Sequence, residues 1–410
     1  QKVEGDTHLF RMPVQVAFGQ PARKQPVIET IQVGARGEAE DGFSVSLTKR
    51  PTWVRFDYEN KVLKTLKFDR PEELLLNQLR EDEMTGRVEA ALELGRKGTP
   101  TGVAALIETM RKDLFWGVQA AAARALGEAR TSAARTALVE ALEHPESRVR
   151  AAAARALGAW QGDDEVGRAL ATVIQKDRSY LAAASAAGAL GRTRARNAAT
   201  ELKKALQRDS QREQIRQAAL AGLAALRDER QLPVILDAAK PGLHQRVRQV
   251  ALSRAADLAV NLPQEQRLPV REAAEDALRD PQYFARRGGI EALRRLGDAG
   301  AIGALEATIA RDVEGAVRSE ARAAVESLRA GRTSEEALNN LRDEVAPLRR
   351  TGDELRSRLE KLEPAPKPVG KTAAANRAKP TAAAARTAAR PAARAGAKAK
   401  APSPAPSRKR

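Results

Sequence analysis

One helical phrase, rich in Ala and Leu, recurs along most of the chain. Its versions include RVEAALELG, QAAAARALGEAR, RVRAAAARALGAW and LAAASAAGALGR. One Leu of each copy can serve as an anchor, which gives Leu94, Leu126, Leu157, Leu190, Leu226, Leu258, Leu296 and Leu328. The anchors are 32, 31, 33, 36, 32, 38 and 32 residues apart. A repeat of this length predicts a solenoid of stacked helix pairs, because no single pair can bury its apolar face alone.

The repeats predict a helical array of about eight pairs over residues 71–332. We expect Asp69 to cap the first helix and Pro71 to lie in its first turn. A Gly follows the anchor in five copies, and Gly favours a left-handed cap at a helix end. The predicted caps are Gly95, Gly127, Gly158, Gly191 and Gly297.

Residues 1–70 have a different pattern. The segments MPVQVAF, VIETIQV, FSVSLTK and WVRFDYE alternate apolar and polar residues with a period of two, which is typical of strands with one face on a core. Most of the Phe residues of the chain also lie here. We expect a small β-sandwich with an edge or face that needs another domain to cover it.

The chain after the array divides into two segments. Residues 333–363 show a leucine seam with 3-4 spacing, which predicts a long helix that Pro347 kinks. This helix could cap the last repeat or form a coiled coil with a second chain, and the pattern favours the cap. Residues 364–410 are Ala, Lys, Arg, Pro and Thr with almost no large apolar residue, so we expect a disordered tail.

The positive charge is concentrated in that tail. The net charge is +18, and twelve Lys and Arg without any acid lie in residues 364–410, which leaves +6 for residues 1–363. The tail is expected to make weak, salt-dependent contacts with nucleic acid or another anionic surface. It has no aromatic residue for base stacking, so specific recognition is not expected. The candidate contacts are Lys398, Lys400, Arg408, Lys409 and Arg410.

Arginines also recur inside the repeats. Arg124 and Arg155 occupy the same repeat position, and others begin the second helices, namely Arg148, Arg150, Arg246, Arg248 and Arg318. They could form a basic stripe for phosphate or an acidic peptide, or an inter-repeat ladder with Asp and Glu. The charge of only +6 over 363 residues favours the ladder.

The residues of catalysis and metal binding are sparse. Cys is absent, and His8, His144 and His244 are too far apart for a helical H-E-x-x-H pair. We expect His144 and His244 to be loop or capping residues. Asp163 and Asp164 are adjacent, but a solvated turn explains them better than a metal site does. The sequence therefore predicts no catalytic residue, metal ligand or cofactor in this chain.

The apolar runs are short. The longest, LAAASAAGAL, has about ten residues, whereas a membrane-spanning helix needs about 20. The chain is expected to be soluble, in a bacterial cytoplasm or periplasm or secreted, with the compartment left open.

Two family resemblances follow from these segments. HPESRVRAAAARALG at residues 144–158 resembles a HEAT repeat of the short bacterial type. FRMPVQVAF at 10–18, PTWVRFD at 51–57 and KVLKTLKFDRPEELLLNQL at 61–79 resemble the small β-domain of aminopeptidase N-like zinc metallopeptidases, which leads into a helical superhelix. The zinc-binding H-E-x-x-H and the G-x-M-E-N motif of that family are absent from this chain.

The second resemblance implies a functional context. It implies that this chain is a non-catalytic C-terminal region whose superhelix closes over the active site of an upstream catalytic domain and gates peptide access. That domain would be a partner and would carry the zinc, with peptide on the concave face of the repeats. The alternatives are a free-standing HEAT scaffold that binds a protein partner, and a polyanion-binding protein that acts through its tail.

Overall fold

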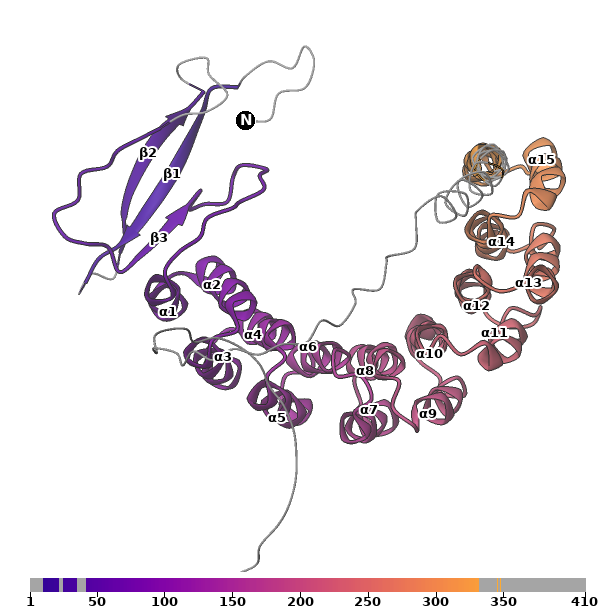
Figure 1. The fold of residues 1–410 in the computed structure, drawn as a ribbon, viewed down its shortest axis with the longest axis horizontal. Coiled ribbons are helices and arrows are strands. Elements are labelled where there is room, and N and C mark those ends of the chain that lie inside the picture. Colours follow the sequence, from indigo (N-terminus) through magenta and orange to yellow (C-terminus); the bar gives the residue numbers. More distant parts are fainter. Residues whose placement is uncertain (1–9, 22–24, 35–41, 332–344, 346, 348–410) are drawn as a thin grey trace, which may run out of the picture. The chain divides into compact units, whose positions relative to one another are not determined.

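The computed structural model describes residues 10–21, 25–34, 42–331, 345 and 347 (Figure 1). Gln1–Leu341 form one compact unit, and Arg342–Arg410 are a second. Apart from residues 345 and 347, the helix expected over residues 333–363 and the tail over 364–410 lie outside the described residues.

The N-terminal part is one antiparallel sheet. Strands β1 (Met12–Gly19), β2 (Val27–Val33) and β3 (Trp53–Phe56) lie in the order β2-β1-β3. Three of the four expected strands are therefore present. Residues 43–49 form no strand, and the described residues contain one sheet where we expected two packed sheets. Alternation indicates a half-buried extended chain, but it cannot supply the neighbour to which a strand must hydrogen-bond.

Eight helix pairs follow the sheet, as the repeats predict. The first helix of each pair lies in an outer layer and the second in an inner layer (Figure 1). The outer elements are α1 (Glu72–Glu81), α3 (Pro100–Lys112), α5 (Ser132–Glu140), α7 (Asp164–Lys176), α9 (Ala198–Ala205), α11 (Leu232–Asp237), α13 (Gln264–Ala277) and α15 (Ile302–Arg311). The inner elements are α2 (Met84–Lys97), α4 (Trp116–Ala129), α6 (Ser147–Leu157), α8 (Tyr180–Thr193), α10 (Gln214–Ala225), α12 (Gln245–Ala259), α14 (Tyr283–Leu296) and a last helix described over residues 315–331. The array also contains four short 3-10 helices, at Ala141–Glu143, Gln211–Glu213, Glu229–Gln231 and Ala299–Ala301.

The core confirms most of the anchors and corrects two of them. Leu94, Leu126, Leu157 and Leu190 are fully buried. Leu226 and Leu258, however, are only partly buried, whereas Leu223 of α10 and Ala256 of α12 are among the fully buried residues of these helices. With these two as anchors, the spacing is 33 residues on either side of Leu223, and the irregularity of the repeat is confined to the 40 residues between Ala256 and Leu296.

The glycines after the anchors have a different role from the predicted one. Only Gly297 is a left-handed cap, with φ of 68°. Gly95 and Gly191 lie inside their helices, where a Cβ would come 2.6 Å from the Ala125 carbonyl oxygen and 2.1 Å from that of Gly222, respectively. These glycines therefore let successive inner helices approach closely. Gly127 is also inside its helix, while Gly158 ends α6 with a right-handed φ of −62°.

The sheet is joined to the first helix pair by buried charged residues. Arg70 donates to the Val54 carbonyl oxygen at 3.3 Å and to Gln78 Oε1 at 2.6 Å, and it also pairs with Glu93. Arg55 is 1% exposed and lies 3.6 Å from the Asp82 carboxylate. The sheet and the start of the solenoid are therefore tied by several polar contacts.

The expected cap at Asp69 was wrong. Helix α1 begins after Pro71, which is its N-cap, and Asp69 instead pairs with Lys97 at 2.8 Å. The amides of Leu74 and Leu75 donate to the Pro71 carbonyl oxygen, and no side chain caps the helix.

None of the helices in the described ranges is both long enough and apolar enough to cross a bilayer.

Candidate functional site

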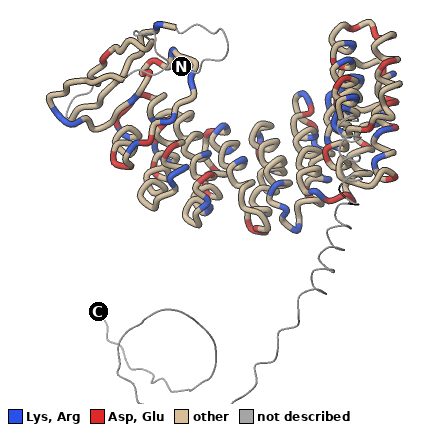
Figure 2. Tube along the Cα trace, turned by 45° about the horizontal axis from the view of Figure 1, so that its top comes forward, with Lys and Arg blue, Asp and Glu red and all other residues tan. Residues whose placement is uncertain are grey.

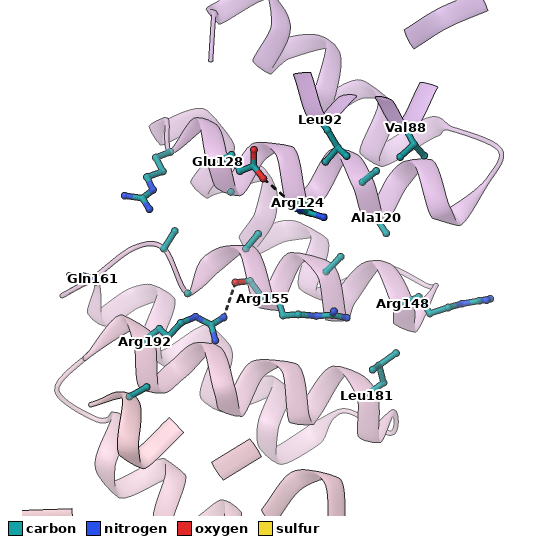
Figure 3. Close-up of a pocket in the computed structure, with 18 of the residues that line it drawn as sticks. Val88, Leu92, Ala120, Arg124, Glu128, Arg148, Arg155, Gln161, Leu181 and Arg192 are labelled. Carbon is teal, nitrogen blue, oxygen red and sulfur yellow. Dashed lines mark hydrogen bonds and ion pairs between the residues drawn. The ribbon is translucent and has the colours of Figure 1, made fainter. Parts of the chain in front are cut away.

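A large groove in the described part of the chain lies on the inner layer. Five successive inner helices, from α2 to α10, line a groove of about 1300 Å³ (Figure 3). The apolar part of its surface comes from Val88, Leu92, Trp116, Leu181, Ala120, Ala121, Ala152, Ala156, Ala159 and Ala225. The small alanines leave the space that larger side chains would fill.

The charged side chains of the groove are almost all positive. Its lining contains one carboxylate, Glu128, and seven arginines, namely Arg124, Arg130, Arg148, Arg155, Arg192, Arg194 and Arg227. All seven arginines are exposed. Elsewhere on the array, positive and negative residues are mixed (Figure 2). The modest charge of residues 1–363 therefore conceals a local excess of cations.

Arg148 lies beside an aromatic ring at one side of the groove. Its guanidinium is 3.8 Å from the centre of the Trp116 ring, and its Nε donates to Glu146 at 2.9 Å. The hydrogen bonds from Arg148 lower the pKa of Glu146 to about 2. Arg148 is therefore held in place by a cation–π contact and an ion pair.

Arg192 and Arg155 meet without a carboxylate. Nη2 of Arg192 donates to the Arg155 carbonyl oxygen at 3.1 Å, and Nη1 donates to that of Gly188 at 3.1 Å (Figure 3). Desolvation in the groove wall and the charge of Arg155 both lower the pKa of Arg192. A Cβ on Gly158 would lie 2.7 Å from Arg192 Nη2, so the missing side chain of Gly158 leaves room for this guanidinium.

Three of the arginines have a left-handed backbone. Arg130, Arg194 and Arg227 have φ of 52°, 51° and 55° and directly follow the inner helices or their last turns. This conformation costs a residue with a Cβ about 1–2 kcal/mol, and strained residues cluster at functional sites. Gly98 and Gly297 hold the equivalent place after α2 and α14. The groove therefore has arginines in a left-handed conformation at the place where α2 and α14 are followed by glycine.

The arginines singled out from the sequence divide between the two interpretations. Arg150 donates to Asp177 at 2.7 Å and Arg248 pairs with Asp280, so both belong to the predicted inter-repeat ladder. Arg318 donates to the carbonyl oxygens of Asp312 and Val313. The same ladder contact recurs in two pairs that the sequence did not single out, Arg87–Asp113 and Arg286–Asp312.

The remaining predicted arginines point to other surfaces. Arg124, Arg148 and Arg155 line the groove, and Arg246 lies 4.3 Å from the centre of the Phe284 ring. Arg148 and Arg150 are two positions apart, as are Arg246 and Arg248. A shift of two positions turns a helical side chain by about 200°, so the two members of each pair face different sides of their helix and have different partners.

The histidines and paired aspartates are structural. Nδ1 of His144 accepts from the Glu146 amide at 3.1 Å, and Nδ1 of His244 accepts from the Arg246 amide at 3.2 Å, which confirms capping roles. Asp163 caps α7 and binds Arg135, whose hydrogen bond lowers the pKa of Asp163 to about 2. Asp164 accepts from the Arg196 amide at 3.0 Å. No cluster of three or more potential metal ligands occurs among the described residues.

Some candidates lie outside the described residues, and some groove residues were missed. His8, Lys398, Lys400, Arg408, Lys409 and Arg410 are outside the described part. The sequence reasoning missed Trp116, Leu181, Arg130, Arg192, Arg194 and Arg227. A signal existed for three of these, because an Arg occurs four residues after the buried Leu126, Leu190 and Leu223. The misplaced anchor at Leu226 concealed that regularity.

Comparisons with known proteins bear on the array. No curated protein matches significantly. Among solved structures, the complex of CpcE and CpcF of phycocyanin lyase from Nostoc is 20% identical, with a TM-score of 0.33, and the match covers 66% of this chain and 98% of that one. Human deoxyhypusine hydroxylase is 20% identical, with a TM-score of 0.29 and coverage of 63% and 96%. Aminopeptidase A of Legionella pneumophila is 12% identical, with a TM-score of 0.47 and coverage of 77% of this chain and 45% of that one.

The match to a family model is local. The model for HEAT repeats matches residues 72–158 and 103–187, which run from the start of α1 to the middle of α8. The following helix pairs continue the same two-layer stacking. Residues 72–187 are therefore HEAT repeats, and the helical array that they begin is a HEAT-repeat solenoid.

Proposed function

We propose that this chain is the non-catalytic C-terminal region of an aminopeptidase N-like zinc metallopeptidase. Its solenoid closes over the active site of an upstream domain and restricts which peptides enter. The proposal rests on the sequence resemblance of the β-domain and on one structural observation. That observation is a set of exposed apolar side chains in the sheet region and in the segment after β3, which are joined to the first repeats.

The segment after β3 is held in an exposed, extended form. Asp57 accepts hydrogen bonds from the Lys61 amide at 3.0 Å and the Val62 amide at 2.9 Å, and from Lys64 Nζ at 2.7 Å. These contacts fix the start of the segment, which forms no strand. Leu63 is consequently 103% exposed and Leu66 is 39% exposed.

This surface has the features of a domain contact. Phe43 and Ile28 of the sheet region are also exposed. A groove of about 1000 Å³ lies between residues 60–70 and helix α2. Large exposed apolar patches mark interaction sites in folded proteins, and these four side chains are the candidates for such a site here. An upstream domain would cover them.

The zinc of such a peptidase would not be held by this chain. A catalytic zinc site needs several His and carboxylate ligands, and the described residues contain no suitable cluster. His144 and His244 already accept backbone hydrogen bonds. In the reaction, this chain would bind some peptides and would keep other peptides out of the active site.

The test uses the protein translated from the whole coding sequence. We expect an H-E-x-x-H motif upstream of Gln1 and zinc-dependent hydrolysis of aminoacyl reporters, with no hydrolysis by this chain alone. Leu63→Asp with Leu66→Asp should weaken the binding of the separately produced upstream domain to this chain. Leu114→Asp is the matched control, because Leu114 is also 103% exposed but lies between α3 and α4. A whole protein without the motif would overturn the proposal.

A second candidate function is a free-standing HEAT scaffold that binds a protein partner. The observation that favours it is the groove, which could serve a partner without any peptidase. A scaffold would bind a defined partner in the absence of any peptidase domain, and Leu63→Asp would leave that binding unchanged. Binding of polyanions through the tail stays a prediction, which a comparison of DNA binding by the full chain and by residues 1–363 would test.

A further inference from the structure

We propose that the groove between α2 and α10 binds an extended acidic peptide that also carries apolar side chains. The carboxylates of the peptide would pair with the groove arginines, and its apolar side chains would contact Trp116, Leu181 and the alanines. This inference does not depend on the peptidase proposal, since it concerns the groove of this chain alone.

The arginines are available for a ligand. No ion pair to a carboxylate is found for Arg130, Arg155, Arg192, Arg194 or Arg227 among the described residues, whereas the ladder arginines are paired. Glu128 is 3.6 Å from Arg124 and is the one acid in the lining. Guanidinium groups bind carboxylates with two parallel hydrogen bonds, so an acidic ligand would supply what the groove lacks.

Backbone strain is a second, independent observation. Arg130, Arg194 and Arg227 are left-handed at sites where glycine would be unstrained, as Gly98 and Gly297 show for the same fold. A side chain at these sites lowers stability and supplies no internal ion pair among the described residues. The position of all three in the lining of one groove points to a binding role.

The groove surface favours a peptide over a nucleic acid. Binding to single-stranded nucleic acid relies on aromatic rings that stack on bases. Trp116 is the one aromatic residue in the lining, and Arg148 already lies against its ring. The rest of the apolar surface is formed by small and aliphatic side chains, which suit the apolar residues of a peptide.

The dimensions suit a short peptide. Packed helices lie about 9 Å apart, and an extended chain advances about 3.3 Å per residue. A peptide that crosses the five inner helices would therefore need on the order of ten residues.

The test measures binding of the full chain to a fluorescein-labelled peptide of about twelve residues with repeated Glu-Ala-Glu-Leu, in about 0.15 M salt. The binding variant is Arg130→Gly, Arg194→Gly and Arg227→Gly together. It removes three charges and relieves the strain, so its melting temperature should not fall. The matched control is Arg168→Gln, Lys176→Gln and Arg279→Gln, which removes three exposed charges, two from α7 and one from the turn after α13.

We expect the glycine variant to bind the acidic peptide at least tenfold more weakly than the wild type, and the control to bind as the wild type does. A peptide with Lys in place of Glu should not bind. Equal binding by the glycine variant and the control would overturn the proposal and assign the binding to another basic segment, such as the tail. Tighter binding of a single-stranded oligonucleotide than of the acidic peptide would overturn it in favour of nucleic acid.

Discussion

The guanidinium of Arg192 donates to the main-chain carbonyl oxygen of Arg155 at 3.1 Å, so two arginines of successive repeats meet at the groove wall without a carboxylate. The charge of Arg155 contributes to the lowered pKa of Arg192. An acidic ligand would offset this repulsion, and the contact is therefore a sensitive place to perturb the groove.

Gly158→Ala should weaken peptide binding without destabilising the fold. The new Cβ would lie 2.7 Å from Arg192 Nη2, which is the end of a flexible side chain that can move away. Gly158 has a right-handed backbone, so Ala should raise stability by about 0.4–1 kcal/mol through the unfolded state. Thermal melting and anisotropy with the acidic peptide would check this. A variant that melts earlier than the wild type would contradict the packing described for Gly158.

Gly191→Ala should have the opposite effect on stability. Its Cβ would lie 2.1 Å from the Gly222 carbonyl oxygen, and backbone of a packed helix cannot move aside cheaply. Overpacking of this kind costs about 1–3 kcal/mol. Urea denaturation would measure the loss. Equal stability of the Gly191→Ala and Gly158→Ala variants would contradict the close contact between α8 and α10.

Leu223→Ala and Leu226→Ala form a matched pair that tests the corrected anchor. Leu223 is fully buried, and its truncation should cost about 2–5 kcal/mol. Leu226 is only partly buried, so its truncation should cost clearly less. Urea denaturation of both variants would rank them. A larger loss of stability in Leu226→Ala than in Leu223→Ala would support Leu226 as the anchor of this repeat and contradict the correction.

The ladder should make stability depend on pH. Burial of Asp177 opposes its ionisation, but hydrogen bonds from Arg150 and from the Ser179 amide outweigh burial and lower the pKa of Asp177. A carboxylate with a lowered pKa in the folded state stabilises the fold above its unfolded pKa of about 3.9, and this stability is lost as the pH falls through the folded pKa.

Asp177→Asn should therefore reduce stability at neutral pH by about 1–2 kcal/mol and flatten the loss below about pH 4. Urea denaturation between neutral pH and about pH 3 would show both effects. Asp69→Asn is the control, because Asp69 is almost fully exposed where it pairs with Lys97. A loss at neutral pH as large in the control as in Asp177→Asn would contradict a structural role for the ladder.

The sequence was sufficient to predict the solenoid because each copy of the repeat shows the same pattern of buried residues. Leu94, Leu126, Leu157 and Leu190 recur at the buried position, and one irregular copy, Leu226, does not change the fold class. The pattern could not show what Gly191 does, since a helix-ending Gly and a close-packing Gly look alike without the neighbouring helix.

The groove was harder to predict for a related reason. Net charge averages over the chain, so the carboxylates of the ladder concealed the arginines of the inner layer. Arg148 and Arg150 are two residues apart and have different partners, Glu146 with Trp116 and Asp177, respectively. Only the stacking of the repeats decides which arginine faces which surface.

The most direct measurement of the central claim, that peptide binds on the inner layer of the repeats, is hydrogen–deuterium exchange of the full chain with and without the acidic peptide. We predict slower exchange at the ends of α4 and α8 and in the residues that follow them, which include Arg130 and Arg194. The outer helices α7 and α13 should be unchanged. Protection confined to residues 364–410, or none within α4 to α10, would contradict the account.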